Sequence, residues 1–202
     1  MAGKELRVIN EKIGYWEASE NPLSADVGVI RSDGQLWLYD VGDGEENVPE
    51  QREDAKIVLS HFHRDHAGNI DRVHAGDIYV SKETHRHIHR GTVLEGEWTA
   101  GELKIFPLPS SHARGCLGLE VDGQYAFVGD ALYGRMKDGR CVYNVQFLKQ
   151  EIAVLKGLRA PYLLVSHRKG LIRRREEAIA ELEEIYGSRS KSSPEIVIRQ
   201  NK

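Results

Sequence analysis

Short apolar runs separated by turn residues dominate the first two thirds of the chain, and they predict many short β-strands. Residues 27–30 and 36–39 flank Ser32-Asp33-Gly34, a turn sequence typical of a β-hairpin. Further strand-like runs lie at residues 56–60, 77–80, 103–106, 117–121, 125–128 and 162–165.

Helical patterns lie between and after these runs, and two of them begin at good capping residues. Ser81 can cap a helix, and so can Asn144, after which apolar residues recur three, four and three positions apart. Strands with helices at intervals indicate a layered α/β or α+β domain. The expected helices cover residues 65–73, 81–90, 145–155 and 172–185.

The composition is that of a globular chain. Its 202 residues suit one domain, and 40% hydrophobic with 29% charged residues excludes a membrane-embedded or disordered chain. The net charge of -3 argues against a nucleic-acid-binding protein, because such proteins usually have a basic surplus. We expect a folded domain at residues 1–187 and a polar linker and C-terminal tail at residues 188–202, with a short edge strand at 195–198.

The sequence lacks the features of an exported or membrane-anchored protein. Its first seven residues do not form the apolar core of a signal peptide, and no apolar run approaches a membrane span. Cys116 and Cys141 are too few for a disulfide framework and have no partner that suggests nucleophilic chemistry. We therefore expect a reduced, cytoplasmic protein without a membrane partner.

Four potential metal ligands stand close together after the predicted strand at residues 56–60. His61 and His63 are two positions apart on an extended segment, so both side chains can point to the same side. Asp65 and His66 follow where the chain turns into a helix. Nitrogen and oxygen donors at this spacing are what a metal centre needs, and the alternative is a cluster of surface histidines.

Three more donors follow strands elsewhere in the chain. His112, Asp130 and His167 each come directly after a predicted strand, where the loops of a layered sheet converge. A lone histidine usually packs or faces solvent, but three donors in one structural context strengthen the prediction of a metal site.

At these residues the sequence resembles the metallo-β-lactamase superfamily, and the resemblance runs from Asp40 to His167. It implies a single domain with a four-layer αββα sandwich and metal ions at one edge of the packed sheets. Residues 38–42 are similar to the first motif, whose aspartate, here Asp40, usually supports the metal site. The remaining motifs match in order at His61-x-His63-x-Asp65-His66, His112, Asp130 and His167.

The resemblance also implies two divalent metal ions and the ligands of each. Such ions, about 3.5–4 Å apart, share a water and lower its pKa towards ~7, giving a bridging hydroxide that attacks a carbonyl carbon or phosphorus. Asp65 would hold one ion and orient this hydroxide. Imidazole and carboxylate ligands suit zinc first, with iron or manganese as alternatives. The implied sets are His61, His63 and His112 on one ion and Asp65, His66 and His167 on the other, with Asp130 between them.

Some positions depart from the family pattern. His63 stands where the oxygen-reducing diiron branch usually carries Glu, which favours a hydrolase. Ser111 precedes His112 where glycine is usual, and Arg168-Lys169-Gly170 follows His167. These changes leave the ligands intact and alter the substrate side.

Other residues could contact the substrate. Tyr133 lies three positions after Asp130, as does a tyrosine that polarises the substrate carbonyl in the lactonase branch; alternatively, it packs in its loop. The histidines within residues 85–89 are expected to form a solvated basic helix face rather than a metal site. Four basic residues could bind a carboxylate or phosphate group of the substrate: Arg135, Lys137, Arg168 and Lys169. The alternative is that they are ordinary surface charges.

The favoured function is that of a binuclear metal-dependent hydrolase acting on an ester-like small molecule, namely a lactone, thioester or phosphodiester. The expected partner is this substrate, with an anionic one as an option, and no nucleic acid. Two alternatives stay open: a mononuclear iron persulfide dioxygenase of the same fold, and a non-catalytic metal-binding or regulatory member. The metal content per chain would separate the first two.

Overall fold

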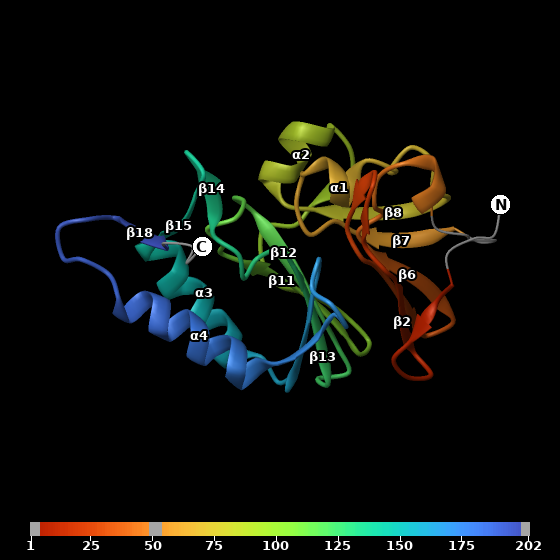
Figure 1. Ribbon diagram of the computed structural model, residues 1–202. Coiled ribbons are helices and arrows are strands. Elements are labelled where there is room, and N and C mark those ends of the chain that lie inside the picture. The colour runs from red at the N-terminus through yellow and green to blue at the C-terminus, as the bar shows by residue number, and fades with distance from the viewer. Residues whose placement is uncertain (1–4, 49–53, 199–202) are drawn as a thin grey trace.

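A computed structural model describes residues 5–48 and 54–198 of the chain, and two large mixed sheets form its centre (Figure 1). The first sheet has the order β1 (Arg7–Val8), β2 (Ile13–Trp16), β5 (Val27–Ser32), β6 (Gln35–Tyr39), β7 (Ala55–Val58), β8 (Ala75–Val80) and β9 (Thr92–Val93). The second sheet has the order β10 (Trp98–Ala100), β11 (Leu103–Leu108), β12 (Cys116–Val121), β13 (Tyr125–Gly129), β16 (Tyr162–Val165) and β17 (Ile172–Arg174).

The remaining elements are two small sheets and the helices. One small sheet is the hairpin β3 (Ser19–Glu20) and β4 (Leu23–Ser24); the other has the order β14 (Arg135–Lys137), β15 (Arg140–Asn144) and β18 (Glu195–Ile198). The helices are α1 (Arg64–Ala67), α2 (Lys82–Ile88), α3 (Val145–Gly157) and α4 (Arg175–Gly187), with a short 3-10 turn at Glu45–Asn47.

The central strands of the two large sheets bury both of their faces, which explains the layers. In β6, Trp37 and Tyr39 pack between the two sheets, whereas Leu36 and Leu38 pack on the opposite face, towards α1. Successive side chains of a strand point to opposite faces, so a strand that is apolar at every position needs cover on both sides. The first sheet therefore lies between the second sheet and the α1–α2 layer.

The second sheet is covered in the same way. Phe127 of β13 packs between the sheets, while its neighbours Ala126 and Val128 join the cluster formed with Leu148 of α3 and Leu182 of α4. Helices α3 and α4 thus form the fourth layer, on the far side from α1 and α2 (Figure 1). The predicted four-layer αββα architecture is confirmed.

The capping residues of two helices behave as predicted. The Ser81 hydroxyl accepts a hydrogen bond from the Thr84 backbone N–H at 3.1 Å. The Asn144 side chain accepts bonds from the N–H groups of Gln146 and Phe147, both at 3.0 Å. These bonds satisfy N–H groups that the first turn of a helix leaves without partners.

The start of the last predicted helix differs from expectation, whereas the short edge strand predicted at residues 195–198 is present as β18. The prediction that this helix begins at Ile172 is wrong: Ile172–Arg174 forms β17, and α4 begins at Arg175. Ile172 pairs with Leu164 of β16, and this edge pairing outweighs the helical spacing of Ile172. In the expected tail, β18 pairs with β15, while residues 199–202 lie outside the described part of the chain. The N-terminal strands β1 to β4 were not expected from the sequence.

This arrangement brings several loops to one edge of the sandwich. The strands β7, β13 and β16 are parallel to a neighbour in their sheets, and each leads directly into predicted ligands. The loop after β11 adds His112. No helix among residues 5–48 and 54–198 is long and apolar enough to cross a membrane.

Candidate metal centre

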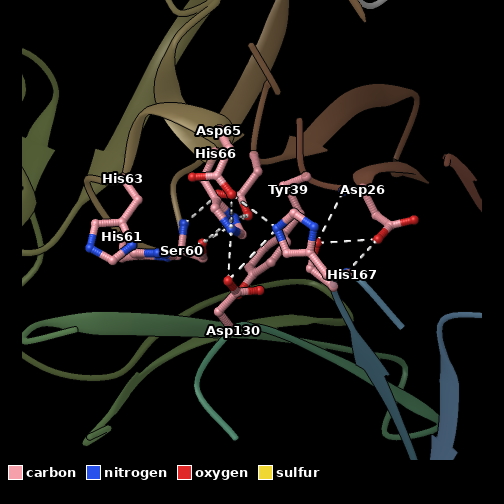
Figure 2. A network of polar contacts seen from close by, with 12 residues as sticks. Asp26, Tyr39, Ser60, His61, His63, Asp65, His66, Asp130 and His167 are labelled. Carbon is pink, nitrogen blue, oxygen red and sulfur yellow. Dashed lines mark hydrogen bonds and ion pairs between the residues drawn. The ribbon is translucent and has the colours of Figure 1, made fainter. Parts of the chain in front are cut away.

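The seven predicted metal ligands meet at this edge in two groups. Figure 2 labels six of them, all but His112. Within each group, one potential ligand atom from every member lies within 4.8 Å of those from all the others. The first group is His61, His63 and His112, and the second is Asp65, His66, Asp130 and His167.

Asp130 lies between the two groups. Its Oδ2 atom is 3.5 Å from Nε2 of His112 in the first group. The same atom is 3.4 Å from Nε2 of His66 and 3.8 Å from Nε2 of His167 in the second group. One carboxylate oxygen therefore faces donors of both groups.

The local backbone explains why the donors converge. His63 is the extended N-cap residue of α1, so His61 and His63 precede the helix while Asp65 and His66 lie in its first turn. Gly129 has φ 53°, and a Cβ at this position would lie 2.9 Å from Cβ of Ser60. Only glycine permits both the left-handed backbone and this close approach of the Asp130 loop to the histidine segment.

A buried hydrogen-bond network beneath the site orients one histidine of each group. The Asp40 carboxylate accepts bonds from the Ser60 N–H at 2.7 Å and the Ser60 hydroxyl at 2.8 Å. It also lies 2.7 Å from Nδ1 of His66, which therefore donates to it. Because the Ser60 hydroxyl donates its proton to Asp40, its oxygen accepts from Nδ1 of His61, 2.9 Å away. Both rings then turn Nε2 towards the site. In the neutral ring of His61 this atom is unprotonated, and in His66 it becomes a metal ligand once it loses its proton.

The first group is a set of neutral imidazoles. Burial lowers the pKa of His61, His63 and His112, because it disfavours the charged ring. Nδ1 of His63 lies 3.0 Å from Nε2 of His112, so the two rings share a hydrogen bond. Neutral rings at this spacing have lone pairs available for a cation.

The second group pairs imidazoles with carboxylates. Burial opposes a charge on His66, but Asp40 and Asp130 outweigh it and raise its pKa to about 10. The bond to Asp65, at 3.0 Å, raises the pKa of His167. Burial acts to raise the pKa of Asp130, yet the adjacent His66 lowers it below its usual value. The carboxylates of this group therefore favour protonated rings on His66 and His167.

Buried atoms without partners test whether a metal fits this site. Nε2 of His61, Nε2 of His66 and Oδ1 of Asp130 are buried and have no hydrogen-bond partner within the described residues. Leaving such atoms unpaired is costly, and a coordinated cation would satisfy them. The donors, imidazoles and carboxylates, suit zinc, iron or manganese. The residues present therefore fit one or two divalent metal ions.

Asp26 fixes the loop that carries His167, and sequence reasoning did not single it out. His167 has the left-handed φ of 58°, uncommon for a residue with a side chain. Its N–H donates to Oδ2 of the buried Asp26 at 2.9 Å, and the Ser166 hydroxyl donates to the same atom at 3.2 Å. Oδ1 of Asp26 accepts from Ala18 N–H at 3.0 Å, so one carboxylate joins the two halves of the fold beside the site. The one signal in the sequence was that Asp26 directly precedes the apolar run at residues 27–30.

Tyr133 has a different partner from the substrate carbonyl expected of a lactonase-like phenol. Its hydroxyl donates to the backbone carbonyl of Ser166 at 2.8 Å. Its ring is partly buried against the cluster that contains α3 and α4, and burial raises its pKa to about 12. These contacts favour the alternative in which Tyr133 packs and ties the Asp130 loop to the His167 loop.

The four basic residues considered for substrate binding divide into two pairs. Arg135 and Lys137 on β14 both form ion pairs with Glu195 of β18, the latter at 3.2 Å. Arg168 and Lys169 instead line a pocket of about 630 Å³ together with His63, Asp65, His112, Asp130 and His167. Only the second pair adjoins the metal centre.

The histidines of α2 stay outside both groups of potential ligands in the described chain. His87 is half exposed and stacks on Phe62, with ring centroids 3.8 Å apart and planes at 13°. Phe62 lies between His61 and His63 in the sequence. His87 therefore contacts a neighbour of the predicted ligands rather than the ligands themselves. Both cysteines are free thiols.

Comparisons with known proteins identify the fold. No family model matches the sequence, and no curated protein matches it. Solved structures do match: a B3 metallo-β-lactamase with an active-site glutamic acid has 14% identity and a TM-score of 0.70, over 91% of this chain and 87% of that one. FIM-1 from Pseudomonas aeruginosa, a metallo-β-lactamase in its mono-zinc form, has 16% identity and a TM-score of 0.67, over 91% and 96%.

An archaeal metallo-β-lactamase superfamily protein from Sulfolobus tokodaii matches over the whole chain. It has 18% identity and a TM-score of 0.59, and 91% of its own length is covered. Similarity at these identities rests on the arrangement of strands and helices rather than on the sequence. This chain therefore has the metallo-β-lactamase fold.

Proposed function

We propose that this protein is a metal-dependent hydrolase that holds two divalent ions, zinc foremost, and cleaves an ester-like small molecule. The candidate substrates are a lactone, a thioester and a phosphodiester. The observation that carries the proposal is the position of Asp130 Oδ2, which lies 3.5 Å from His112 of the first group and 3.4 Å from His66 of the second. A carboxylate between two sets of donors suits a two-metal site. The mono-zinc form of FIM-1, a protein of the same fold, supports zinc.

The residues of the chain would divide the work of holding the ions. The neutral rings of His61, His63 and His112 can bind a cation without first losing a proton. Asp65, His66 and His167 would hold the second ion, with Asp130 as the shared ligand. Asp40 and Ser60 keep Nε2 of His61 and His66 directed at the site, so the donors need little rearrangement on binding.

Two ions in such a site activate water as a nucleophile near neutral pH and stabilise the negative charge that develops on the substrate. Asp65 would orient this nucleophile as well as hold an ion, since its carboxylate is only partly buried and lines the pocket. The pocket volume of about 630 Å³ is typical of small-molecule sites. The pocket is therefore large enough for a small-molecule ester.

The test combines metal analysis with a substrate panel. The purified protein is stripped with a chelator, reloaded with zinc, iron or manganese, and analysed for metal per chain. Each form is then assayed on a lactone, a thioester and a phosphodiester. We expect two metal equivalents and hydrolysis of at least one ester class, lost on chelation and restored by metal.

Other outcomes would overturn this proposal. One iron per chain together with oxygen consumption on a persulfide would support the dioxygenase alternative. Two bound metals without hydrolysis of any ester class would support a metal-binding or regulatory protein.

A further inference from the structure

The loop after His167 presents two cations to the pocket that the metal centre does not use. Arg168 and Lys169 are exposed and line the same pocket as His63 and Asp65. Within residues 5–48 and 54–198, neither forms an ion pair. Arg135 on β14, in contrast, pairs with Glu195 and does not line this pocket. Cations left unpaired beside a candidate active site indicate an anionic ligand.

The backbone under these two residues is held in place. His167 N–H is bonded to Asp26 at 2.9 Å, and Leu171 N–H donates to the Arg168 carbonyl at 2.9 Å, closing a turn. Val165 N–H donates to the Leu171 carbonyl at 2.9 Å, and the Leu171 side chain is 2% exposed, within the cluster between the sheets. A loop fixed at both ends positions the two side chains with less loss of entropy on binding.

The acidic residues of the pocket are largely committed to other partners. Asp26 accepts three hydrogen bonds from the neighbouring loops, and Asp65 and Asp130 belong to the second group of potential metal ligands. Glu17 forms an ion pair with Arg7 at 3.3 Å. Glu20 on β3 is the acidic side chain that remains at the pocket wall. The two cations therefore outnumber the uncommitted carboxylates.

The remaining wall is partly apolar. Tyr15 of β2, Ala18 and Leu23 of β4 line the pocket from the N-terminal half of the chain, and Leu23 is 54% exposed. An exposed leucine beside a polar site indicates contact with an apolar part of a ligand. The pocket thus offers an apolar surface and a cationic surface beside the same metal centre.

We propose that Arg168 and Lys169 form an anion subsite, so that the substrate carries a carboxylate or a phosphate group in addition to its scissile ester bond. This proposal rests on the proposed hydrolase function and specifies its substrate class. The guanidinium of Arg168 can bind either anion through two parallel hydrogen bonds, and Lys169 adds a point charge.

The experiment uses three 4-nitrophenyl esters with the same leaving group on the zinc-loaded protein. The acyl groups are hexanoyl, which is neutral, adipyl, which ends in a carboxylate, and 5-phosphonopentanoyl, which ends in a phosphonate. The test variant is R168A/K169A. The matched control is R135A/K137A, which removes the same charge from a pair bound to Glu195.

We expect kcat/KM of the wild-type protein to be at least tenfold higher for one anionic ester than for hexanoate at low salt. This ratio should fall to about one in R168A/K169A and persist in R135A/K137A. The faster of the two anionic esters identifies carboxylate or phosphate as the preferred group. Equal rates on all three esters, or a preference that survives in R168A/K169A, would overturn the subsite.

A binding measurement separates failure of the subsite from failure of the hydrolase. Adipate and phenylphosphonate are titrated by calorimetry into the zinc-loaded wild-type protein and both variants. If no ester is hydrolysed but one anion binds R168A/K169A at least tenfold more weakly than the other two proteins, the subsite stands and the hydrolase proposal fails. Equal affinities in all three proteins would exclude the subsite whatever the esters show.

Discussion

The metal centre and the middle of α3 both bury polar atoms without hydrogen-bond partners, and they do so in different ways. At the metal centre, the unpartnered atoms of His61, His66 and Asp130 belong to two groups of converging donors. On α3, both carboxylate oxygens of Glu151 are unpartnered, and this residue belongs to no donor group among those described. Unpaired buried polar atoms are costly in both places. Unpaired buried atoms indicate a bound ion only where several potential ligands converge.

The two regions relieve this cost by different means. A cation at the metal centre would satisfy the unpartnered atoms of both groups at once. Glu151 is fully buried, and burial alone raises the pKa of its carboxyl well above the usual value, so a bound proton replaces the missing partner. The first region should respond to metal, and the second to pH.

The largest effect is expected from the carboxylate between the groups. Asp130→Ala should lose at least one metal equivalent per chain and lower ester hydrolysis by at least about a hundredfold, because losing even an outer-shell partner of a metal ligand lowers metal affinity or activity 10–100-fold. Metal analysis and kcat/KM measure both. His87→Ala, which removes a ring stacked on Phe62, is the control and should lose no metal. A loss of metal in His87→Ala would show that the α2 histidines take part in binding.

Glu151→Gln tests the second region. Burial raises the pKa of this carboxyl in the folded state above its ordinary value of 4.5, which it keeps in the unfolded chain. Because the folded pKa is raised, stability is lost as the pH rises above the unfolded value. The variant should therefore gain stability relative to wild type when the pH is raised from 4 to 7.

Urea unfolding at the two pH values measures the difference. Glu184→Gln on the exposed face of α4 is the control and should change stability by less than about 0.5 kcal/mol at either pH. A Glu151→Gln variant that gains no stability relative to wild type between these pH values would show that this carboxylate has a partner, and the contrast between the regions would fail.

Asp40→Asn sharpens the comparison within the metal centre. Asp40 accepts from Nδ1 of His66 at 2.7 Å and, through Ser60, orients His61. An amide cannot accept all these bonds, so metal affinity should fall about 10–100-fold for both groups. Competition with a chromophoric chelator measures the affinities. Asp43→Asn, whose parent side chain pairs with the exposed Arg64, should change them by less than about threefold. Unchanged affinities in Asp40→Asn would contradict the proposed orientation of the rings.

The smallest effect is expected from Tyr133→Phe. The hydroxyl donates to the Ser166 carbonyl at 2.8 Å, so its removal should lower kcat by less than about threefold and leave metal content unchanged. A tenfold or larger loss of kcat at constant KM and metal content would instead support a phenol that stabilises the reacting carbonyl.

Local patterns in the sequence predicted much of the fold and of the candidate site. The spacing of His61, His63, Asp65 and His66 is a property of consecutive residues, and the capping roles of Ser81 and Asn144 depend on the next few residues only. The position of donors at strand ends follows from the layered architecture. These features need no knowledge of distant contacts.

Contacts between distant segments could not be predicted in the same way. Asp26 meets His167 across 141 positions, and Tyr133 meets Ser166 across 33. Likewise, the sequence does not distinguish Arg135 from Arg168, because each follows a predicted metal ligand. They differ in the structure, where Arg135 pairs with Glu195. The early start predicted for α4 failed because Ile172 fits both a helix pattern and an edge strand.

The central claim is that two metal ions share Asp130, and anomalous diffraction tests it most directly. Crystals of the zinc-loaded protein, measured on both sides of the zinc absorption edge, should show two peaks with ligand distances of about 2.0–2.2 Å. One peak should lie among His61, His63 and His112 and the other among Asp65, His66 and His167, with Asp130 in contact with both. A single peak, or two peaks of which only one contacts Asp130, would contradict the account.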